Sequence, residues 1–341
     1  MKLLVLGGTR FVGRHVVDAA LARGHAVTLF TRGRSAHSWG GRLAAALTGD
    51  RDPHAGAGLS ALEQGTWDAV IDTSGYVPRV VGASAALLAP RVGRYLFVSS
   101  VSVYADSSKP GLDEDAPPAT LADSGTEDIP KHYGALKAAC EVAVTARFGA
   151  RATHVRPGLI VGPFDATDRF GYWVARFIHP RLLGERGPQA VVPAPRAAPI
   201  QIVDARDLAD FLLGLVERDT GGTFNAVSPA GHRTMGDVVD AALDAASSPP
   251  EPAWIDDATL LAHGVEPWVG LPLWLPASEP DSAGFMAVDT RRAIAAGLAT
   301  RPLDATIAAA AAWLAQRDNA GAWQHVLSAD AERRILSAHP G

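Results

Sequence analysis

The chain has 341 residues, of which 48% are hydrophobic and 20% are charged, and its formal net charge is −5. This composition is ordinary for a folded protein and excludes a disordered, collagen-like or coiled-coil chain. The length exceeds the usual ~100 to 200 residues of one domain, which predicts one large α/β unit or two closely joined ones. The acidic balance argues against an extended contact with nucleic-acid phosphates.

Several features that the sequence lacks limit the cellular compartment and the binding partners that we expect for this protein. A single cysteine, Cys140, excludes an internal disulfide and a cluster of thiolate metal ligands. The histidines show no paired metal spacing, so we expect no metal site. The apolar runs are too short or too interrupted to cross a bilayer, and residues 1–8 resemble a buried strand more than a cleavable leader. We expect a cytoplasmic protein with a small-molecule substrate and no nucleic-acid or membrane partner, and we leave a homodimer open.

Short apolar runs alternate with helical patterns along the first half of the chain. A run at 3–6, a helical pattern over 12–22 and a run at 26–30 predict a strand, a crossover helix and a second strand. Runs at 69–71, 95–98 and 152–155 continue a parallel sheet covered on both faces. A helix over 207–217 and a strand over 223–227 indicate that the later chain returns to this sheet. We predict a doubly wound α/β fold in which residues 1–165 and 196–230 form a dinucleotide-binding domain. Residues 166–195 and 231–341 would form a smaller, mostly C-terminal substrate domain.

A glycine-rich segment lies between the first predicted strand and the first predicted helix. Glycines let the backbone approach a pyrophosphate, and the free amides at the start of a helix face the anion. The alternative is a tight turn without a ligand. Arg10 replaces the middle glycine of the usual spacing, so the path of this loop must differ from the usual one. The residues predicted to bind a dinucleotide here are Gly7, Thr9, Arg10, Phe11, Val12 and Gly13.

The second predicted strand ends without the acidic residue that favours NAD. A carboxylate at this point would bond the adenosine ribose hydroxyls, but the sequence has Thr31-Arg32-Gly33-Arg34. Guanidinium groups bind a 2′-phosphate through charge-assisted hydrogen bonds. We therefore predict that Thr31, Arg32 and Arg34 contact the cofactor and that NADP(H) is preferred, with NAD(H) as the second choice. Solvated surface arginines are the alternative interpretation.

Two further loops follow predicted strands at the same edge of the sheet. Asp50 is placed to accept a hydrogen bond from the adenine amino group, although an acidic turn residue explains it equally well. Thr73 and Ser74 follow the run that ends at Ile71, where a loop of small residues offers backbone contacts to a cofactor.

Tyr133 and Lys137 stand four residues apart where a helical pattern opens. Residues at this spacing share a helical face, so the ammonium can lower the pKa of the phenol from its usual value near ~10. With five tyrosines and four lysines in the chain, roughly 0.06 such pairs would arise by chance. Ser100 comes at the end of the preceding predicted strand, where its hydroxyl can donate to a substrate carbonyl, and Ser102 is the competing assignment.

These residues together resemble the extended short-chain dehydrogenase/reductase superfamily, in its NAD(P)-dependent epimerase/dehydratase branch and a variant with Gly-Gly-Thr-Arg-Phe-x-Gly. The resemblance is specific over residues 1–165 and thin after about Pro229. It implies a Rossmann fold with Tyr133 as general acid or base, and with Lys137 lowering its pKa and holding the nicotinamide ribose. It also implies that Ser100 polarises the reacting carbonyl. Pro157 would lie beside the nicotinamide, and a strand-ending Pro-Gly turn is the alternative.

Departures from the family pattern narrow the expected reaction. Val101 and Ser102 stand where sugar-nucleotide dehydratases of the superfamily are expected to carry an Asp-Glu pair, so β-elimination lacks its acid and base. Epimerases of the branch hold NAD tightly, whereas an arginine-rich site suits a cofactor that exchanges at every turnover. We expect an NADP(H)-dependent enzyme that reduces a ketone or oxidises a secondary alcohol of a small molecule by hydride transfer.

Two other functions stay open. A nucleotide-sugar epimerase with tightly bound NAD would need cations for the diphosphate, and Arg196 and Arg206 are the candidates. A non-catalytic regulator or RNA-binding protein is the alternative from another class, because the glycine variant also resembles chloroplast stem-loop RNA-binding proteins. The retained Ser100, Tyr133 and Lys137 speak against that alternative.

Three segments have unassigned roles. The stripe of Phe170, Trp173, Val174 and Phe177 would either roof a substrate pocket or pack in the core. Residues 268–274 would form a hydrophobic lid or an oligomer contact, or would pack around the core. The acidic connection over 105–130 would be solvated or would act as a flexible gate.

Overall fold

The apolar runs of the first half form the strands of a parallel sheet in a computed structural model, which describes residues 1–35, 38–279, 282–317 and 323–339. The seven parallel strands have the order β10-β6-β5-β4-β1-β2-β3. The chain adds β2 and β3 on one side of β1 and the later strands on the other, so the strand order reverses between β1 and β4. Ligands of doubly wound folds bind outside the carboxyl ends of the strands at such a reversal. The strands are β1 (Lys2–Leu6), β2 (Ala26–Thr31), β3 (Ala45–Thr48), β4 (Trp67–Asp72), β5 (Val92–Val98), β6 (Ala152–Pro157) and β10 (Gly222–Ala226).

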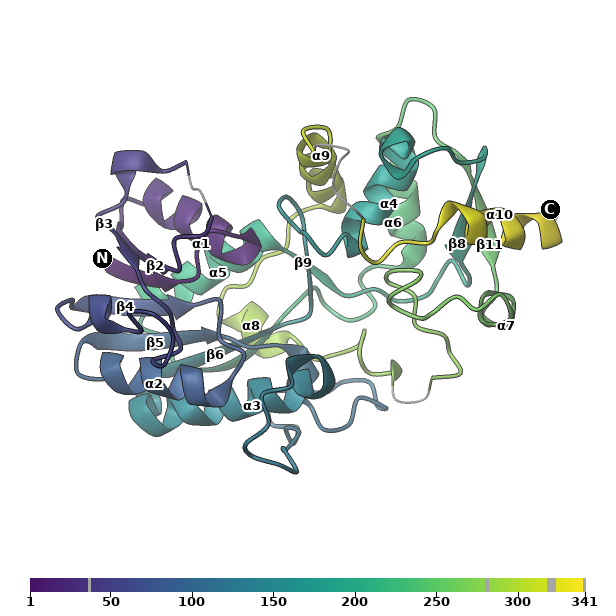
Figure 1. The fold of residues 1–341 in the computed structure, drawn as a ribbon. Helices are drawn as coiled ribbons and strands as arrows, with labels where there is room; N and C mark the ends of the chain where they lie inside the picture. Colours follow the sequence, from purple (N-terminus) through teal and green to yellow (C-terminus); the bar gives the residue numbers. More distant parts are fainter. Residues whose placement is uncertain (36–37, 280–281, 318–322, 340–341) are drawn as a thin grey trace.

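Helices cover both faces of this sheet and make the first of two lobes (Figure 1). One face is covered by α1 (Phe11–Ala22) and α5 (Ala205–Glu217), and the other by α2 (Pro78–Leu88) and α3 (Ile129–Phe148). The strand residues alternate between the two resulting cores: Leu3 and Val5 pack on the α1 side, and Leu4 and Leu6 on the other side. The predicted doubly wound fold is confirmed.

The second lobe has its own hydrophobic core. It contains α4 (Arg169–Ile178), α6 (Met235–Asp244), α9 (Leu303–Leu314) and α10 (Ala329–Ala338), with the paired strands β8 (Gln189–Pro193) and β11 (Glu251–Ile255) and the short α7 (Asp257–Ala262). A short parallel pair, β7 (Leu159–Val161) and β9 (Ile202–Asp204), lies between the lobes in Figure 1. The later chain then returns to the sheet through α5, β10 and α8 (Arg291–Ala295).

The apolar stripe of α4 lies in the core of the second lobe. Its four side chains are at most 1% exposed, which agrees with core packing and not with the roof of a pocket. In residues 268–274, Leu271, Leu273 and Trp274 belong to the same core. The apolar pattern of α4 therefore indicates a helix that packs in the core.

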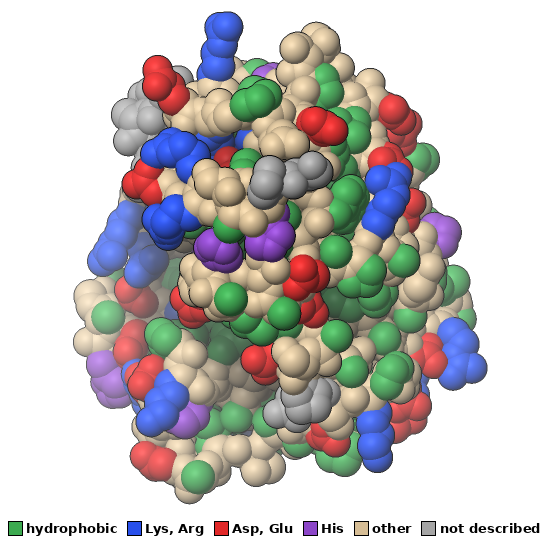
Figure 2. All heavy atoms as spheres, turned by 90° about the vertical axis from the view of Figure 1, so that its right-hand side faces the viewer, with side chains coloured by type: hydrophobic (Ala, Val, Ile, Leu, Met, Phe, Trp, Pro, Cys, Tyr) green, Lys and Arg blue, Asp and Glu red, His purple; other side chains and the backbone are tan. Residues whose placement is uncertain are grey.

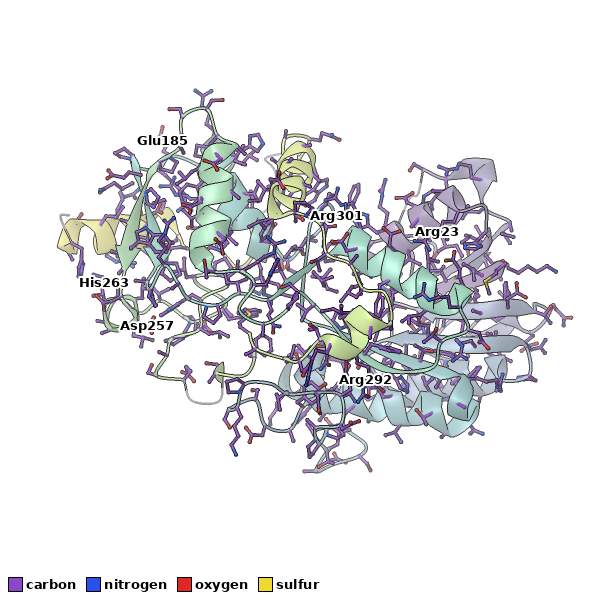
Figure 3. All side chains as sticks on the ribbon, turned by 180° about the vertical axis from the view of Figure 1, so that it is seen from behind. Arg23, Glu185, Asp257, His263, Arg292 and Arg301 are labelled. Carbon is purple, nitrogen blue, oxygen red and sulfur yellow. The ribbon has the colours of Figure 1, made fainter. Side chains whose placement is uncertain are left out.

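The acidic connection between residues 105 and 130 is tied to the rest of the chain. Glu114 is buried and accepts a hydrogen bond from the backbone amide of Asn225 at 2.7 Å. Arg292 of α8, which Figure 3 labels beside this connection, pairs with Glu114 and Asp115. Glu114 is an exception to the predicted solvated segment, because its carboxylate is held inside the protein while Asp113 and Asp115 on either side are exposed. The flexible gate stays a prediction.

Among the described residues, no helix combines the length and the apolar character that a membrane crossing requires. Figure 2 shows the outer face of the second lobe, where acidic and basic side chains are interspersed rather than gathered into one basic band.

Candidate active site

The loop between β1 and α1 is packed tightly against the end of β4. Gly7 has a φ of +106°, which favours glycine, and a Cβ there would lie 2.7 Å from Oγ1 of Thr73. A Cβ on Gly13 would lie 2.6 Å from the backbone nitrogen of Gly8, so the first turn of α1 touches the loop. Within the described chain, Arg10 at the N-cap makes no side-chain capping bond, which leaves the first amides of α1 available to an anion.

Phe11 carries backbone strain in this loop. Its φ of +34° lies in the left-handed region, although it is not a glycine, and it follows directly on Arg10. Val12 and Thr9 are half-buried beside it. The departure of this loop from the usual glycine path stays a prediction, and the positive φ at Phe11 shows that the chain turns sharply directly after Arg10.

The arginines after β2 lie next to this loop. β2 pairs with β1 so that Phe30 stands opposite Leu6, which places Arg32 beyond the same strand ends as Gly7. Thr31 accepts a hydrogen bond from the amide of Gly33 at 3.2 Å. Both Arg32 and Arg34 are exposed, and neither has a side-chain partner within the described ranges. They are free to meet a phosphate, and their role stays a prediction.

The loops after β3 and β4 have internal partners. Asp50 accepts a hydrogen bond from the amide of Asp52 at 3.0 Å, as a turn residue does. Thr73 donates to the carbonyl of Leu6 at 3.1 Å and so joins β4 to β1. Ser74 donates its amide to the carboxylate of Asp72. The cofactor contacts expected of Asp50, Thr73 and Ser74 stay predictions.

A buried ion pair under these loops was missed from the sequence. Arg51 binds the fully buried carboxylate of Asp72 through two hydrogen bonds of 2.7 Å, and the hydroxyl of Tyr95 donates to the same carboxylate at 2.7 Å. The pair connects the loop after β3 to the end of β4. An aspartate at the end of an apolar strand was the available signal, but its arginine is 21 residues away in the chain.

Lys137 is buried below the site and is held by two strand ends. Its Nζ donates to the carbonyl oxygens of Gly75 at 2.7 Å and Val98 at 2.6 Å, and it lies 4.1 Å from the centroid of the Phe97 ring. Burial lowers the pKa of Lys137 to about 8, and the negative charge of Asp72 acts in the opposite direction. The ammonium is therefore engaged by backbone carbonyls at the carboxyl edge of the sheet.

Tyr133 lies at the surface of this edge, next to Ser100. The pKa of Tyr133 is raised, first by burial and then by Tyr76, whose ring centroid is 6.4 Å away. The hydroxyl of Ser100 and the charge of Arg169 lower the pKa of Tyr133 and so act in the opposite direction. The predicted lowering of this pKa by Lys137 is wrong for this structure, because burial dominates and the ammonium is committed to Gly75 and Val98.

Ser100 is fixed by the short helical turn that it caps. Its Oγ accepts a hydrogen bond from the amide of Ser102 at 3.1 Å, and the two serine hydroxyls are also 3.1 Å apart. Of the two serines, only Ser100 affects the pKa of Tyr133, which it lowers. This effect favours Ser100 over Ser102 as the partner of the phenol.

The sixth strand brings a second buried arginine close to the site. Arg156 donates two hydrogen bonds of 2.9 and 2.7 Å to the carboxylate of Glu141. It donates a third, of 3.2 Å, to the hydroxyl of Tyr104. Pro157 follows it as the buried last residue of β6. The contact of Pro157 with a nicotinamide stays a prediction.

The comparisons with known proteins agree with this geometry. The model of the NAD dependent epimerase/dehydratase family matches residues 3–226. The chain belongs to this family. From residue 3 on, the family match covers the seven strands of the sheet, the helix α3 that carries Tyr133 and Lys137, and the turn that carries Ser100.

Solved structures that are similar to this family member span most of both chains. UDP-glucuronic acid 4-epimerase from Bacillus cereus, in complex with NAD, is 15% identical, with 94% of this chain and 99% of that one covered and a TM-score of 0.65. The human epimerase family protein SDR39U1, with NADPH, is 22% identical over 92% of this chain and 99% of that one, with a TM-score of 0.58.

One curated relative is similar in sequence to this family member. It is the chloroplast stem-loop binding protein of 41 kDa b from Arabidopsis thaliana, 30% identical over 177 residues. The match covers 48% of this chain and 43% of the relative's length, so the chain spans less than half of that protein.

The residues of this family member fit a dinucleotide. The glycine loop leaves no room for a Cβ at Gly7 or Gly13, and the first amides of α1 lack a side-chain cap among the described residues. Arg32 and Arg34 stand beyond β2 without partners in the described part of the chain. An anion held at the start of α1 and a second phosphate near β2 would both meet unused donors.

Proposed function

We propose that the protein is an NADP(H)-dependent oxidoreductase that interconverts a ketone and a secondary alcohol of a small molecule. The observation that carries the proposal is that Lys137 is held at the carboxyl edge of the sheet, one turn of α3 from Tyr133, and that Ser100 at the same edge affects the pKa of this tyrosine. The nicotinamide cofactor, when bound, supplies or accepts the hydride. The protein residues supply the proton and the orientation.

Each of the three residues has a distinct part in this proposal. In the direction of reduction, the raised pKa keeps Tyr133 protonated at neutral pH, so its hydroxyl can donate a proton to the developing alkoxide. Ser100 donates a hydrogen bond to the reacting oxygen and polarises the carbonyl. Lys137 donates two of its three N–H groups to Gly75 and Val98, and the third would hold the ribose next to the nicotinamide.

NADP(H) is proposed over NAD(H) because of the arginines beyond β2. No carboxylate follows Thr31, and Arg32 and Arg34 are unpartnered in the described chain. A 2′-phosphate would gain charge-assisted hydrogen bonds there, whereas the 2′-hydroxyl of NAD would leave both cations facing water.

A nucleotide-sugar epimerase is the second candidate, favoured by family membership and by the fold shared with the Bacillus cereus epimerase. Its diphosphate would need free cations in the second lobe. Arg206 is bound through two hydrogen bonds to Asp204, and Arg196 pairs with Asp240. Both arginines suggested for the diphosphate already have carboxylate partners, which makes this candidate weaker. Purified protein that carries tightly bound NAD would reverse the order.

RNA binding is the candidate suggested by the name of the curated relative. The net charge of −5 and the mixed charges on the face in Figure 2 offer little to a phosphate backbone. Salt-sensitive binding of a stem-loop RNA by the purified protein would favour this candidate over catalysis.

The test titrates NADPH and NADH into the purified protein and screens ketones with each cofactor. We expect tighter binding of NADPH, and a Tyr133→Phe variant that loses roughly 100-fold or more in kcat while NADPH affinity is unchanged. Tyr172→Phe is the matched control, because the buried hydroxyl of Tyr172 has no hydrogen-bond partner within the described residues. Unchanged turnover in Tyr133→Phe would refute the proton donor, and NADH binding at least as tightly as NADPH would refute the cofactor preference.

A further inference from the structure

Arg169 brings a positive charge from the second lobe to the phenol of the first. It is the first residue of α4, and its guanidinium is close enough to Tyr133 to lower the pKa of that phenol. The guanidinium carbon also lies 5.7 Å from the centroid of the Trp268 ring. The charge of Arg169 therefore acts where the substrate would meet the proton donor.

Within the described residues, Arg169 lacks a carboxylate partner, unlike two other arginines of the chain. Arg317 pairs with Asp168, and Arg156 pairs with Glu141. Within the described ranges, Arg169 makes no ion pair, and its Nε is buried without a hydrogen-bond partner. A half-buried guanidinium with an unused N–H is costly unless something binds it.

His325 orients this guanidinium. Its Nδ1 lies 2.8 Å from the carbonyl oxygen of Thr167 and its Nε2 lies 3.1 Å from Nη2 of Arg169. Because a carbonyl can only accept and a guanidinium can only donate, Nδ1 carries the proton and Nε2 accepts. The imidazole therefore accepts one N–H of Arg169, while Nη1, which is not among the buried atoms, makes no hydrogen bond in the described part of the chain.

Asp165 limits how much negative charge this place can take. It is 2% exposed, its Oδ1 accepts from the amide of Thr167 at 2.8 Å, and its Oδ2 is buried without a partner in the described chain. The charges of Asp165 and Arg169 act on each other, yet the two side chains are not within ion-pair distance. A negative charge on Asp165 would repel a dianion about twice as strongly as a single carboxylate, so the place beside Arg169 favours a ligand with one negative charge.

We propose that the substrate carries a carboxylate near its reacting carbonyl and that Arg169, oriented by His325, binds it, so that the substrate class is an oxo acid or the corresponding hydroxy acid. This inference rests on the proposed oxidoreductase function, since it names the substrate of the same site. A guanidinium and a carboxylate match as a planar pair, which would fix the substrate against Tyr133 as well as bind it.

The experiment compares oxo acids with their methyl esters as substrates with NADPH. We expect the wild-type protein to prefer the acid, and Arg169→Gln to lower kcat/KM for the acid by about 10- to 100-fold while the ester changes little. Arg169→Lys should keep part of the preference. The matched control is Arg334→Gln, because Arg334 is an exposed arginine of α10 in the same lobe.

A second variant tests the charge limit. Asp165→Asn keeps an oxygen for the amide of Thr167 but removes the negative charge next to Arg169. We expect it to bind the hydroxy acid about 2- to 10-fold more tightly in isothermal titration calorimetry with NADP⁺ present. A merely structural role of Asp165 would not tighten binding.

The outcomes separate this inference from the function on which it rests. Binding of hydroxy acids that depends on Arg169, without any turnover, would retain the carboxylate site and refute the oxidoreductase. Reduction of ketones or esters that depends on Tyr133, without preference for acids, would retain the oxidoreductase and refute the carboxylate site. Equal losses for acid and ester in Arg169→Gln would likewise refute it.

Discussion

Two titratable side chains of the site are shifted in opposite directions by the same cause. Burial raises the pKa of the Tyr133 phenol and lowers that of the Lys137 ammonium to about 8, because each shift favours the neutral form. The phenol is therefore protonated throughout the neutral range, while the ammonium begins to lose its proton just above it. We therefore expect Lys137, and not Tyr133, to limit the proposed reaction at mildly alkaline pH.

This difference predicts the pH dependence of the reduction reaction. We expect kcat/KM for NADPH to fall above about pH 8, since deprotonation removes the charge of Lys137. In Lys137→Arg the guanidinium stays charged, so the fall near pH 8 should disappear even if the plateau is lower. Steady-state rates between pH 6 and pH 10, with the range set by ~2 units on either side of that pKa, are the measurement. A fall that is unchanged in Lys137→Arg would assign the titration to another group.

The placement of a site residue was predictable where its spacing from another residue on the same helix shows that the two share a face. Tyr133 and Lys137 are such a pair, because residues four apart on a helix lie on the same face. The partners of Lys137 were not predictable, since Gly75 and Val98 lie 62 and 39 residues away in sequence and contribute only backbone carbonyls. Arg169 was equally hidden, because its place near Tyr133 arises from the contact between two lobes.

At the level of elements, α3 is shaped to bring its tyrosine to Ser100. The helix is kinked at His132, whose φ and ψ are −125° and 26°, directly before Tyr133. One residue later, Gly134 lies against the backbone of Ser102, and a Cβ at this position would collide with the Ser102 carbonyl oxygen. The close approach of helix and turn is therefore possible only because residue 134 has no side chain.

Gly134→Ala should move Tyr133 on α3 away from Ser100. The added methyl group would push α3 away from Ser102, so we expect kcat to fall about 10-fold or more while the Kd of NADPH changes little. Gly82→Ala in α2 is the matched control, because its nearest neighbour would be the Cβ of Ala143 at 3.8 Å. That variant should be neutral or more stable by roughly 0.5–1 kcal/mol in chemical denaturation. A fully active Gly134→Ala protein would contradict the importance of this approach.

The strands of the sheet were predicted well because hydrophobic runs alternate regularly with helices. The β10 strand and α5 were also visible, since their patterns resemble those of the first half. The roles of the acidic connection were not predictable, because Glu114 is held by a backbone amide from β10 and an arginine from α8. Such contacts depend on the tertiary fold and leave no local signal.

In the whole molecule, the chain passes repeatedly between the two lobes. It leaves the sheet after β6, returns through α5 and β10, leaves again and returns through α8. Arg301, labelled in Figure 3, binds Asp207 of α5 at 2.7 Å and ties the later chain to the first lobe. The first lobe is therefore built from segments that are far apart in sequence.

This interleaving predicts how fragments behave. A fragment of residues 1–165 lacks α5, whose Leu208 and Leu212 are fully buried, and lacks β10, which pairs with β6. We expect this fragment to unfold without cooperativity in circular dichroism and to fail to bind NADPH. Co-expression with residues 166–341 should restore binding. A 1–165 fragment that folds cooperatively and binds NADPH would show that the first lobe needs no later segment.

The position of Arg169 has a consequence for motion. Its guanidinium belongs to the second lobe, whereas the phenol on which it acts belongs to the first. A hinge rotation between the lobes would separate the two without disturbing either hydrophobic core. In the proposed reaction, a substrate bound by Arg169 and Tyr133 would therefore contact both lobes at once and would hold them together.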